Sequence, residues 1–113
     1  MIQGIGIDVI EVGRIKKIIE KYEKRFINRV FTEEEILYCM EKAVKYQCFA
    51  GRFAAKEAVI KALGGRIKFY QEISILHTEN GPKVFIKSHP GWNIFVSITH
   101  IKELAMAMAI WEG

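Results

Sequence analysis

The sequence predicts an α+β fold, with three helices in the N-terminal half packed on a mainly antiparallel sheet. Three observations favour this class. An apolar, strand-like segment opens the chain, helical patterns follow to about residue 63, and short alternating segments between turns fill the rest. The length of 113 residues suits one domain, 1–113, with one core.

The N-terminal half begins with a run of aliphatic residues from Ile2 to Ile10, which predicts a buried strand that ends near Asp8. An amphipathic helix is predicted next, because apolar residues recur there at helical spacing. Its apolar side consists of Ile15, Ile18, Ile19 and Tyr22.

Two further helices are predicted from their end signals. Thr32 with Glu35 three residues later forms a capping box, which marks the start of the second helix. The third helix is predicted from Tyr46 to Leu63 and ends at Gly64-Gly65, because glycine tolerates the left-handed C-cap conformation. The inward residues of the second helix are predicted to be Ile36, Leu37 and Met40.

The remainder of the chain reads as strands, because short alternating runs are separated by turn residues. Asn80-Gly81-Pro82 and Ser88-His89-Pro90-Gly91 are the two clearest turns. Turns this short join antiparallel strands. The candidate strands are Lys68 to Tyr70, Ile73 to Thr78, Lys83 to Lys87, Trp92 to Thr99 and Leu104 to Trp111.

Composition narrows the function classes. The formal charge of +4 favours anionic partners such as nucleic acid, phosphorylated small molecules or an acidic protein, although an ordinary basic surface explains it equally well. No apolar run approaches the roughly 20 residues of a membrane span, and the start lacks the features of a signal peptide, so we expect a cytoplasmic protein without membrane contact. Cys39 and Cys48 are expected to be free thiols and not zinc ligands.

The third helix is the most informative segment, because its apolar residues go almost all the way round while it carries Glu57 and Lys61. Charged groups on a mostly buried helix are costly unless they pair or hold a ligand. The small residues Ala50 and Ala54 on the same stripe suggest room for a ligand. The alternative is a surface pair at i, i+4, worth a few tenths of a kcal/mol.

Asp8 is the natural partner for Glu57. Mg²⁺ often takes only one or two protein carboxylates, with phosphate and water completing its octahedron. The alternative is that Asp8 merely caps the turn after the first strand. A dinucleotide-binding loop is disfavoured, because Gly4-Ile5-Gly6 lacks the third glycine and has no strand before it.

Two other segments carry polar groups. Ser97-Ile98-Thr99-His100 lies at a strand end and either faces solvent or binds phosphate, since no elbow motif supports a Ser/His nucleophile pair. The basic helix from Arg14 to Lys24 either is a solvated face or docks an acidic helix or nucleic acid. Nucleic acid is disfavoured, because no aromatic RNA-recognition motif accompanies the helix.

Taken together, these residues resemble the holo-acyl-carrier-protein synthase family of 4′-phosphopantetheinyl transferases. The resemblance rests on pieces that occur in family order and cover nearly the whole chain. The family usually has a small hydroxyl residue where this chain has Ile101, and an aspartate where it has Glu72. The matching pieces are Gly4 to Asp8 with Arg14, Phe31-Thr32 with Glu35, Phe49 to Gly64, and Ser97 to His100.

The resemblance implies a trimer with active sites between subunits. It implies Mg²⁺-dependent transfer of phosphopantetheine from coenzyme A to a serine of apo acyl carrier protein, in support of fatty acid biosynthesis. It assigns Asp8, Glu57 and Lys61 to catalysis, with the two carboxylates as metal ligands. The implied coenzyme A contacts are Arg52, Lys61, Gly64, Gly65, Ser97, Thr99 and His100, and the implied carrier contacts are Arg14, Lys17 and Lys21.

In the implied reaction the serine hydroxyl attacks the β-phosphorus of coenzyme A, and adenosine 3′,5′-bisphosphate leaves. Lys61, Glu57 and a water on the metal are the three candidates for the base. Two rival functions remain: a non-enzymatic basic module that binds RNA or an acidic protein, and a phosphodiesterase acting on a nucleotide-like substrate. By helical angle Arg52 lies well away from Glu57 and Lys61, so a neighbouring chain is expected to complete the site.

Overall fold

The computed structural model describes residues 1–113 and confirms the α+β class with antiparallel strands. It has four α-helices where the sequence predicted three. The elements are β1 (Ile2–Glu11), α1 (Val12–Tyr22), α2 (Lys24–Val30), α3 (Glu33–Met40), α4 (Lys45–Ala62), the 3₁₀ turn η1 (Tyr70–Glu72), β2 (Ile73–Thr78), β3 (Gly81–Ile86), β4 (Asn93–His100) and β5 (Leu104–Glu112).

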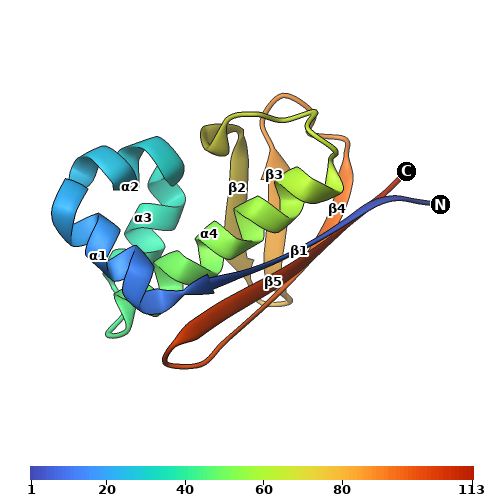
Figure 1. Ribbon diagram of the computed structural model, residues 1–113. Coiled ribbons are helices and arrows are strands. Elements are labelled where there is room, and N and C mark those ends of the chain that lie inside the picture. Colours follow the sequence, from blue (N-terminus) through green and yellow to red (C-terminus); the bar gives the residue numbers. More distant parts are fainter.

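The strands form two antiparallel sheets. One has the order β1-β5-β4, and β2 and β3 pair as a separate hairpin. Helix α4 runs along β1 and β5, and α1, α2 and α3 gather around its N-terminal end (Figure 1). The two chain ends lie together, since Gly113 N donates to Met1 O over 3.0 Å. None of the helices combines the length and the hydropathy that crossing a bilayer requires.

Helix α4 and strand β1 are in backbone contact. A Cβ added to Gly6 would stand 1.9 Å from the carbonyl oxygen of Ala58, and one added to Gly4 would stand 1.8 Å from that of Ala62. Glycine is therefore the only residue that fits at these two strand positions. Asp8 lies two residues after Gly6, on the same face of the strand, so this close approach brings Asp8 to the edge of α4.

The small residues of α4 pack against other parts of the protein and not against a ligand. Ala50 and Ala54 are fully buried in the apolar core, so the interpretation that they leave room for a ligand is wrong. The alanines of α4 allow β1 and the core to approach the helix closely. The helix therefore packs against protein on most of its sides, which explains why its apolar residues are distributed almost all the way round.

The first strand is not buried as predicted. Ile5, Ile7 and Val9 point away from α4, and each is more than half exposed. They are the residues of β1 opposite the glycine face, since alternate side chains of a strand point to opposite faces. Together with exposed residues of the neighbouring strands they form an apolar outer face of the sheet, which consists of Ile5, Ile7, Val9, Phe95, Met106 and Met108.

The helical half differs from prediction in three places. Helix α2 was not predicted. In α3, Leu37 and Met40 are exposed, and the buried residues are Glu35 and Cys39. The helix does begin with the predicted capping-box pair: the N–H of Thr32 donates to Glu35 at 2.8 Å, whereas the Thr32 hydroxyl has no hydrogen-bond partner. The segment predicted as a strand from Lys68 to Tyr70 is irregular chain that leads into η1.

The two cysteines are not free. Cys39 at the end of α3 and Cys48 in the first turn of α4 form a disulfide. They are nine positions apart in sequence, so the bond closes a short loop between the two helices. The expectation of free thiols is wrong, because the helix-to-helix turn brings both side chains to the same buried position.

Candidate active site

Asp8 and Glu57 line the same cavity, of about 350 Å³. Asp8 comes from β1, on the face that packs against α4, and Glu57 comes from the middle of that helix. Both residues are partly buried. Arg14 lines the cavity on another side, and its apolar walls are Val9, Ile10, Ile15, Ile18, Phe26 and Phe53.

Lys61 turns to the first strand and not to Glu57. Its ammonium group donates to Asp8 Oδ1 at 3.3 Å and to the carbonyl oxygen of Ile7 at 3.0 Å. The Lys61 side chain is 54% exposed and that of Asp8 18% exposed. The alternative reading, an i, i+4 surface pair between Glu57 and Lys61, does not occur, and the lysine instead compensates the carboxylate of Asp8 on β1.

Glu57 has a partner that the sequence did not indicate. The hydroxyl of Tyr70 donates a hydrogen bond to Glu57 Oε1. Partial burial raises the pKa of Tyr70 to about 12, and the hydrogen bond to Glu57 and the charges of Glu57 and Asp8 add to the shift. Tyr70 is therefore a neutral hydrogen-bond donor at physiological pH, beside both carboxylates.

The pair of carboxylates fits a hard divalent cation of the Mg²⁺ type. Mg²⁺ prefers oxygen ligands and commonly takes one or two carboxylates, leaving its other positions to water and phosphate. Glu57 Oε2 makes no hydrogen bond within the chain, and Asp8 is the second oxygen donor on the same cavity. No cluster of three or more His, Cys, Asp or Glu residues that could hold a metal ion occurs in the structure.

Arg52 and His100 line a different and smaller cavity, of about 110 Å³. Arg52 is 9% exposed, and its guanidinium lies over the ring of Tyr38 at 4.6 Å. Burial lowers the pKa of Arg52, against the opposing effects of Tyr38 and Glu35. The Arg52 Nε has no partner. A buried cation with a free donor suits a phosphate group, but the cavity is smaller than a whole nucleotide requires.

The remaining candidate residues lie elsewhere. Ser97 and Thr99 are exposed on the outer face of the sheet, where they line a shallow cavity with Ile7 and Met108. Gly64 and Gly65 adopt positive φ values of 60° and 84° directly after α4, about 18 Å along the helix from Arg52. One chain thus presents the candidate residues in four separate groups, and these groups do not surround a common ligand.

The basic side chains of α1 face solvent. Arg14, Lys17 and Lys21 are exposed. Arg14 reaches the cavity of Asp8 and Glu57, whereas the two lysines do not line it.

A groove of about 270 Å³ lies between α1 and α2 and contains both apolar and basic side chains. It is lined by Ile18, Tyr22, Arg25, Phe26 and Arg29. Ile18 and Phe26 also line the carboxylate cavity, so the groove and the cavity are adjacent.

Sequence reasoning missed Tyr70 and Lys56. Lys56 precedes Glu57, yet it is fully buried and pairs with Glu35 at 2.7 Å. Tyr70 lies in a segment that was predicted as a strand. One signal in the sequence could have indicated a buried partner for Glu35. Glu35 is a carboxylate in the first turn of a helix that packs against the core, but the capping box alone accounted for it in the prediction.

Comparison with known proteins gives a single family. Residues 4–109 match the model of the 4′-phosphopantetheinyl transferase superfamily. A curated protein of Chlamydia pneumoniae named holo-acyl-carrier-protein synthase is 44% identical over 114 residues, covering 94% of this chain and 93% of the relative. One of the same name from Halothermothrix orenii is 40% identical over 123 residues, covering 99% and 98%.

A solved structure agrees with this assignment. The crystal structure of a holo-(acyl-carrier-protein) synthase from Bacillus anthracis, in complex with CoA (3′,5′-ADP), superimposes with a TM-score of 0.84. The two sequences are 35% identical, and the match covers 98% of this chain and 96% of that chain. The similarity therefore extends over the fold as a whole and is not confined to the α4 motif.

Proposed function

This chain belongs to the 4′-phosphopantetheinyl transferase superfamily, and we propose that it transfers 4′-phosphopantetheine from coenzyme A to a serine of apo acyl carrier protein. The reaction would depend on Mg²⁺, release adenosine 3′,5′-bisphosphate and support fatty acid biosynthesis in the cytoplasm. The observation that carries the proposal is the single cavity lined by Asp8, Glu57 and Arg14. It combines two hard oxygen ligands with a basic residue at the edge of a basic helix.

In the proposed reaction the serine oxygen forms a bond to the β-phosphorus of coenzyme A as the bond to the bridging oxygen breaks, and the adenosine bisphosphate leaves. Asp8 and Glu57 would hold Mg²⁺, which when bound neutralises charge that develops on the pyrophosphate oxygens. Lys61 already donates to Asp8 at 3.3 Å, an arrangement that suits a protonated ammonium group. We therefore assign Lys61 to charge stabilisation in preference to proton abstraction.

The other proposed coenzyme A contacts lie outside the cavity of Asp8 and Glu57. Arg52 and His100 share a cavity of phosphate size, which supports a role at the 3′-phosphate. Gly64 and Gly65 expose backbone where α4 ends, and Ser97 and Thr99 offer hydroxyl groups on the outer face. Because these groups are separated within one chain, the proposal needs a second chain to bring a complete set to one ligand.

A trimer would supply that second chain. The outer face of the sheet exposes six large apolar side chains side by side on three strands, which is unusual for a face that meets water. Ser97 and Thr99 lie on this face, so a neighbour that covers it would also reach these hydroxyl groups. The apolar face therefore supports an assembly in which active sites lie between subunits, and we propose three subunits from the family resemblance.

The carrier protein would dock on α1 and α2. Arg14, Lys17 and Lys21 are exposed cations, and the adjacent groove adds Arg25 and Arg29 around an apolar floor. An acidic amphipathic helix is complementary to such a surface in both charge and apolar contact. The groove is adjacent to the carboxylate cavity, so a docked carrier would present its serine near Asp8 and Glu57.

One assay tests the proposed function. The purified protein is mixed with coenzyme A, Mg²⁺ and an apo acyl carrier protein, and the intact mass of the carrier is measured. We expect a gain equal to one phosphopantetheine group, together with adenosine 3′,5′-bisphosphate, and no gain after chelation of the metal. No gain with several carriers would favour a non-enzymatic basic module, and hydrolysis of coenzyme A without transfer would favour a phosphodiesterase.

A further inference from the structure

Tyr70 is placed to control the orientation of Glu57. The tyrosine lies at the start of η1, outside the helix that carries the glutamate, and its hydroxyl donates to Glu57 Oε1. The second carboxylate oxygen, Oε2, has no hydrogen-bond partner within the chain. A carboxylate held through one oxygen cannot rotate freely, so its other oxygen keeps a fixed direction.

The position of Tyr70 is itself fixed in two ways. Its ring packs against Phe53, with 5.6 Å between ring centroids, and Phe53 lines the cavity of Asp8 and Glu57. Its backbone carbonyl oxygen accepts a hydrogen bond from Lys56 Nζ at 3.1 Å. Lys56 directly precedes Glu57, so α4 holds both the main chain and the hydroxyl of the same tyrosine.

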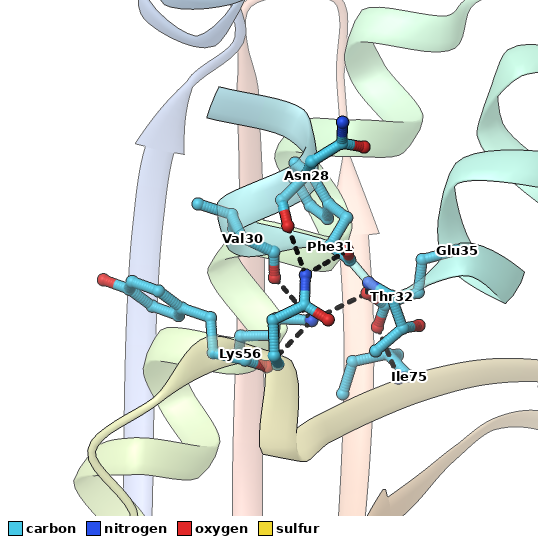
Figure 2. Close-up of polar contacts among 9 residues, drawn as sticks. Asn28, Val30, Phe31, Thr32, Glu35, Lys56 and Ile75 are labelled. Carbon is cyan, nitrogen blue, oxygen red and sulfur yellow. Dashed lines mark hydrogen bonds and ion pairs between the residues drawn. The ribbon is translucent and has the colours of Figure 1, made fainter. Parts of the chain in front are cut away.

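Lys56 provides a rigid anchor because its ammonium group is fully buried and fully paired. Its three acceptors are the carbonyl oxygen of Tyr70, the carbonyl oxygen of Val30 at 2.7 Å and Glu35 Oε1 at 2.7 Å. Glu35 in turn accepts from the backbone of Thr32 at 2.8 Å and Ile75 at 2.6 Å (Figure 2). A buried ion pair with every group satisfied is geometrically specific.

A second clamp holds the same segment. The amide of Gln71, the residue after Tyr70, donates to the carbonyl oxygens of Asn28 and Phe31, each at 2.6 Å. These carbonyls lie at and just beyond the end of α2, next to the Val30 carbonyl that Lys56 uses. Two side chains therefore fix η1 to the end of α2: Lys56, which bonds Tyr70 and Val30, and Gln71, which bonds Asn28 and Phe31.

We propose that Tyr70 is a positioning residue, which orients the Glu57 carboxylate so that its free oxygen faces the cavity beside Asp8 and binds the divalent cation there. The inference rests on the proposed function. Carboxylates that ligate metals are commonly held by hydrogen bonds from neighbouring groups, and loss of such a partner typically costs 10–100-fold in metal affinity or activity. The opposite role is that the hydroxyl competes with the metal for Glu57, and the two roles predict opposite effects of its removal.

Tyr70→Phe removes the hydroxyl and retains the ring that packs on Phe53. With coenzyme A present at saturation, we expect Mg²⁺ affinity measured by calorimetry to fall by about tenfold, and the Mg²⁺ concentration for half-maximal transfer to rise equally. The KM for coenzyme A at saturating Mg²⁺ should stay unchanged. Tyr46→Phe is the matched control, since the Tyr46 hydroxyl makes no hydrogen bond within the chain and lies outside both cavities.

Each outcome is decisive. An unchanged Mg²⁺ affinity in Tyr70→Phe, with wild-type protein binding Mg²⁺ and transferring normally, would overturn the positioning role and leave the proposed function intact. A tighter affinity would assign Tyr70 as a competitor and also overturn it. Wild-type protein that neither binds Mg²⁺ nor modifies the carrier would overturn the proposed function, and the role of Tyr70 with it. A melting temperature within about 2 °C of wild type excludes a merely structural effect.

Discussion

Lys61 on α4 donates to Asp8 on β1 at 3.3 Å, and it does not pair with Glu57 one turn away on its own helix. The contact depends on the close approach of α4 to β1, which Gly4 and Gly6 permit. It leaves Glu57 without a cation and available to Tyr70 and to the cavity. Four charged or polar groups from α4, β1 and η1 thus meet at one place.

The two carboxylates are expected to be essential for transfer. Asp8→Asn and Glu57→Gln should each lower kcat by roughly a thousandfold or more at fixed Mg²⁺, because a lost metal contact removes several kcal/mol of transition-state stabilisation. The measurement is the rate of carrier mass gain, with far-UV circular dichroism to show that the fold persists. Glu79→Gln, in the exposed turn between β2 and β3, is the matched control. Full activity in both variants would refute the metal assignment.

Arg14 is expected to serve the carrier protein more than coenzyme A. Arg14→Glu should lower kcat/KM for the carrier by roughly tenfold and weaken its dependence on salt, because an exposed charge acts mainly through the association rate. The KM for coenzyme A should change little. Lys83→Glu makes the same charge change on exposed β3 and should leave carrier use unaltered. Equal losses for both substrates in Arg14→Glu would argue against docking.

The outer face of the sheet is expected to be an interface. Light scattering should give the mass of three chains, and Ile7→Asp should yield single chains, because a carboxylate at a closely packed apolar contact is left without a partner. Leu37→Asp is the control, since Leu37 is 63% exposed on α3 against 57% for Ile7. If Ile7→Asp remains trimeric, or if the wild-type protein is monomeric, the proposed assembly is incorrect.

The buried pair of Lys56 and Glu35 is expected to dominate the stability of the helical half. Lys56→Met should lower the free energy of unfolding by about 3–5 kcal/mol, because it leaves the buried Glu35 carboxylate uncompensated. Urea denaturation followed by circular dichroism measures the change. Lys68→Met, at an exposed position, should stay within about 0.5 kcal/mol of wild type. A loss as small as that of the control would show that the pair adds little.

Tyr70 makes stability depend on pH in the alkaline range. Its pKa in the folded protein is about 12 against an ordinary value of 10.0, so between these values the folded state keeps a proton that the unfolded state releases. Its contribution to stability is therefore complete below about pH 10 and is lost as the pH rises toward 12. Metal-free wild type should lose stability more steeply across this window than Tyr70→Phe. Identical slopes would contradict the shift.

Local patterns predicted much of the fold. The helix that became α4 was placed to within a residue at each end, because its glycine stop and its apolar pattern are local signals. The strand Ile73–Thr78 was also predicted correctly. Helix α2 was missed, since its seven residues carry no capping signal and its partners lie in distant segments. The segment before η1 was misassigned because aromatic and aliphatic residues there resemble a strand.

The α+β class and the family resemblance follow from the identity and spacing of residues along the chain, and so does the proposal of Asp8 and Glu57 as the metal-binding carboxylates. Which groups these two carboxylates contact depends on how distant elements pack. This packing turned Lys61 toward β1, buried Lys56 against Glu35, and brought Tyr70 to Glu57. These contacts join residues 13 to 53 positions apart, and such distances are set by how α4, β1 and η1 pack and not by any local pattern.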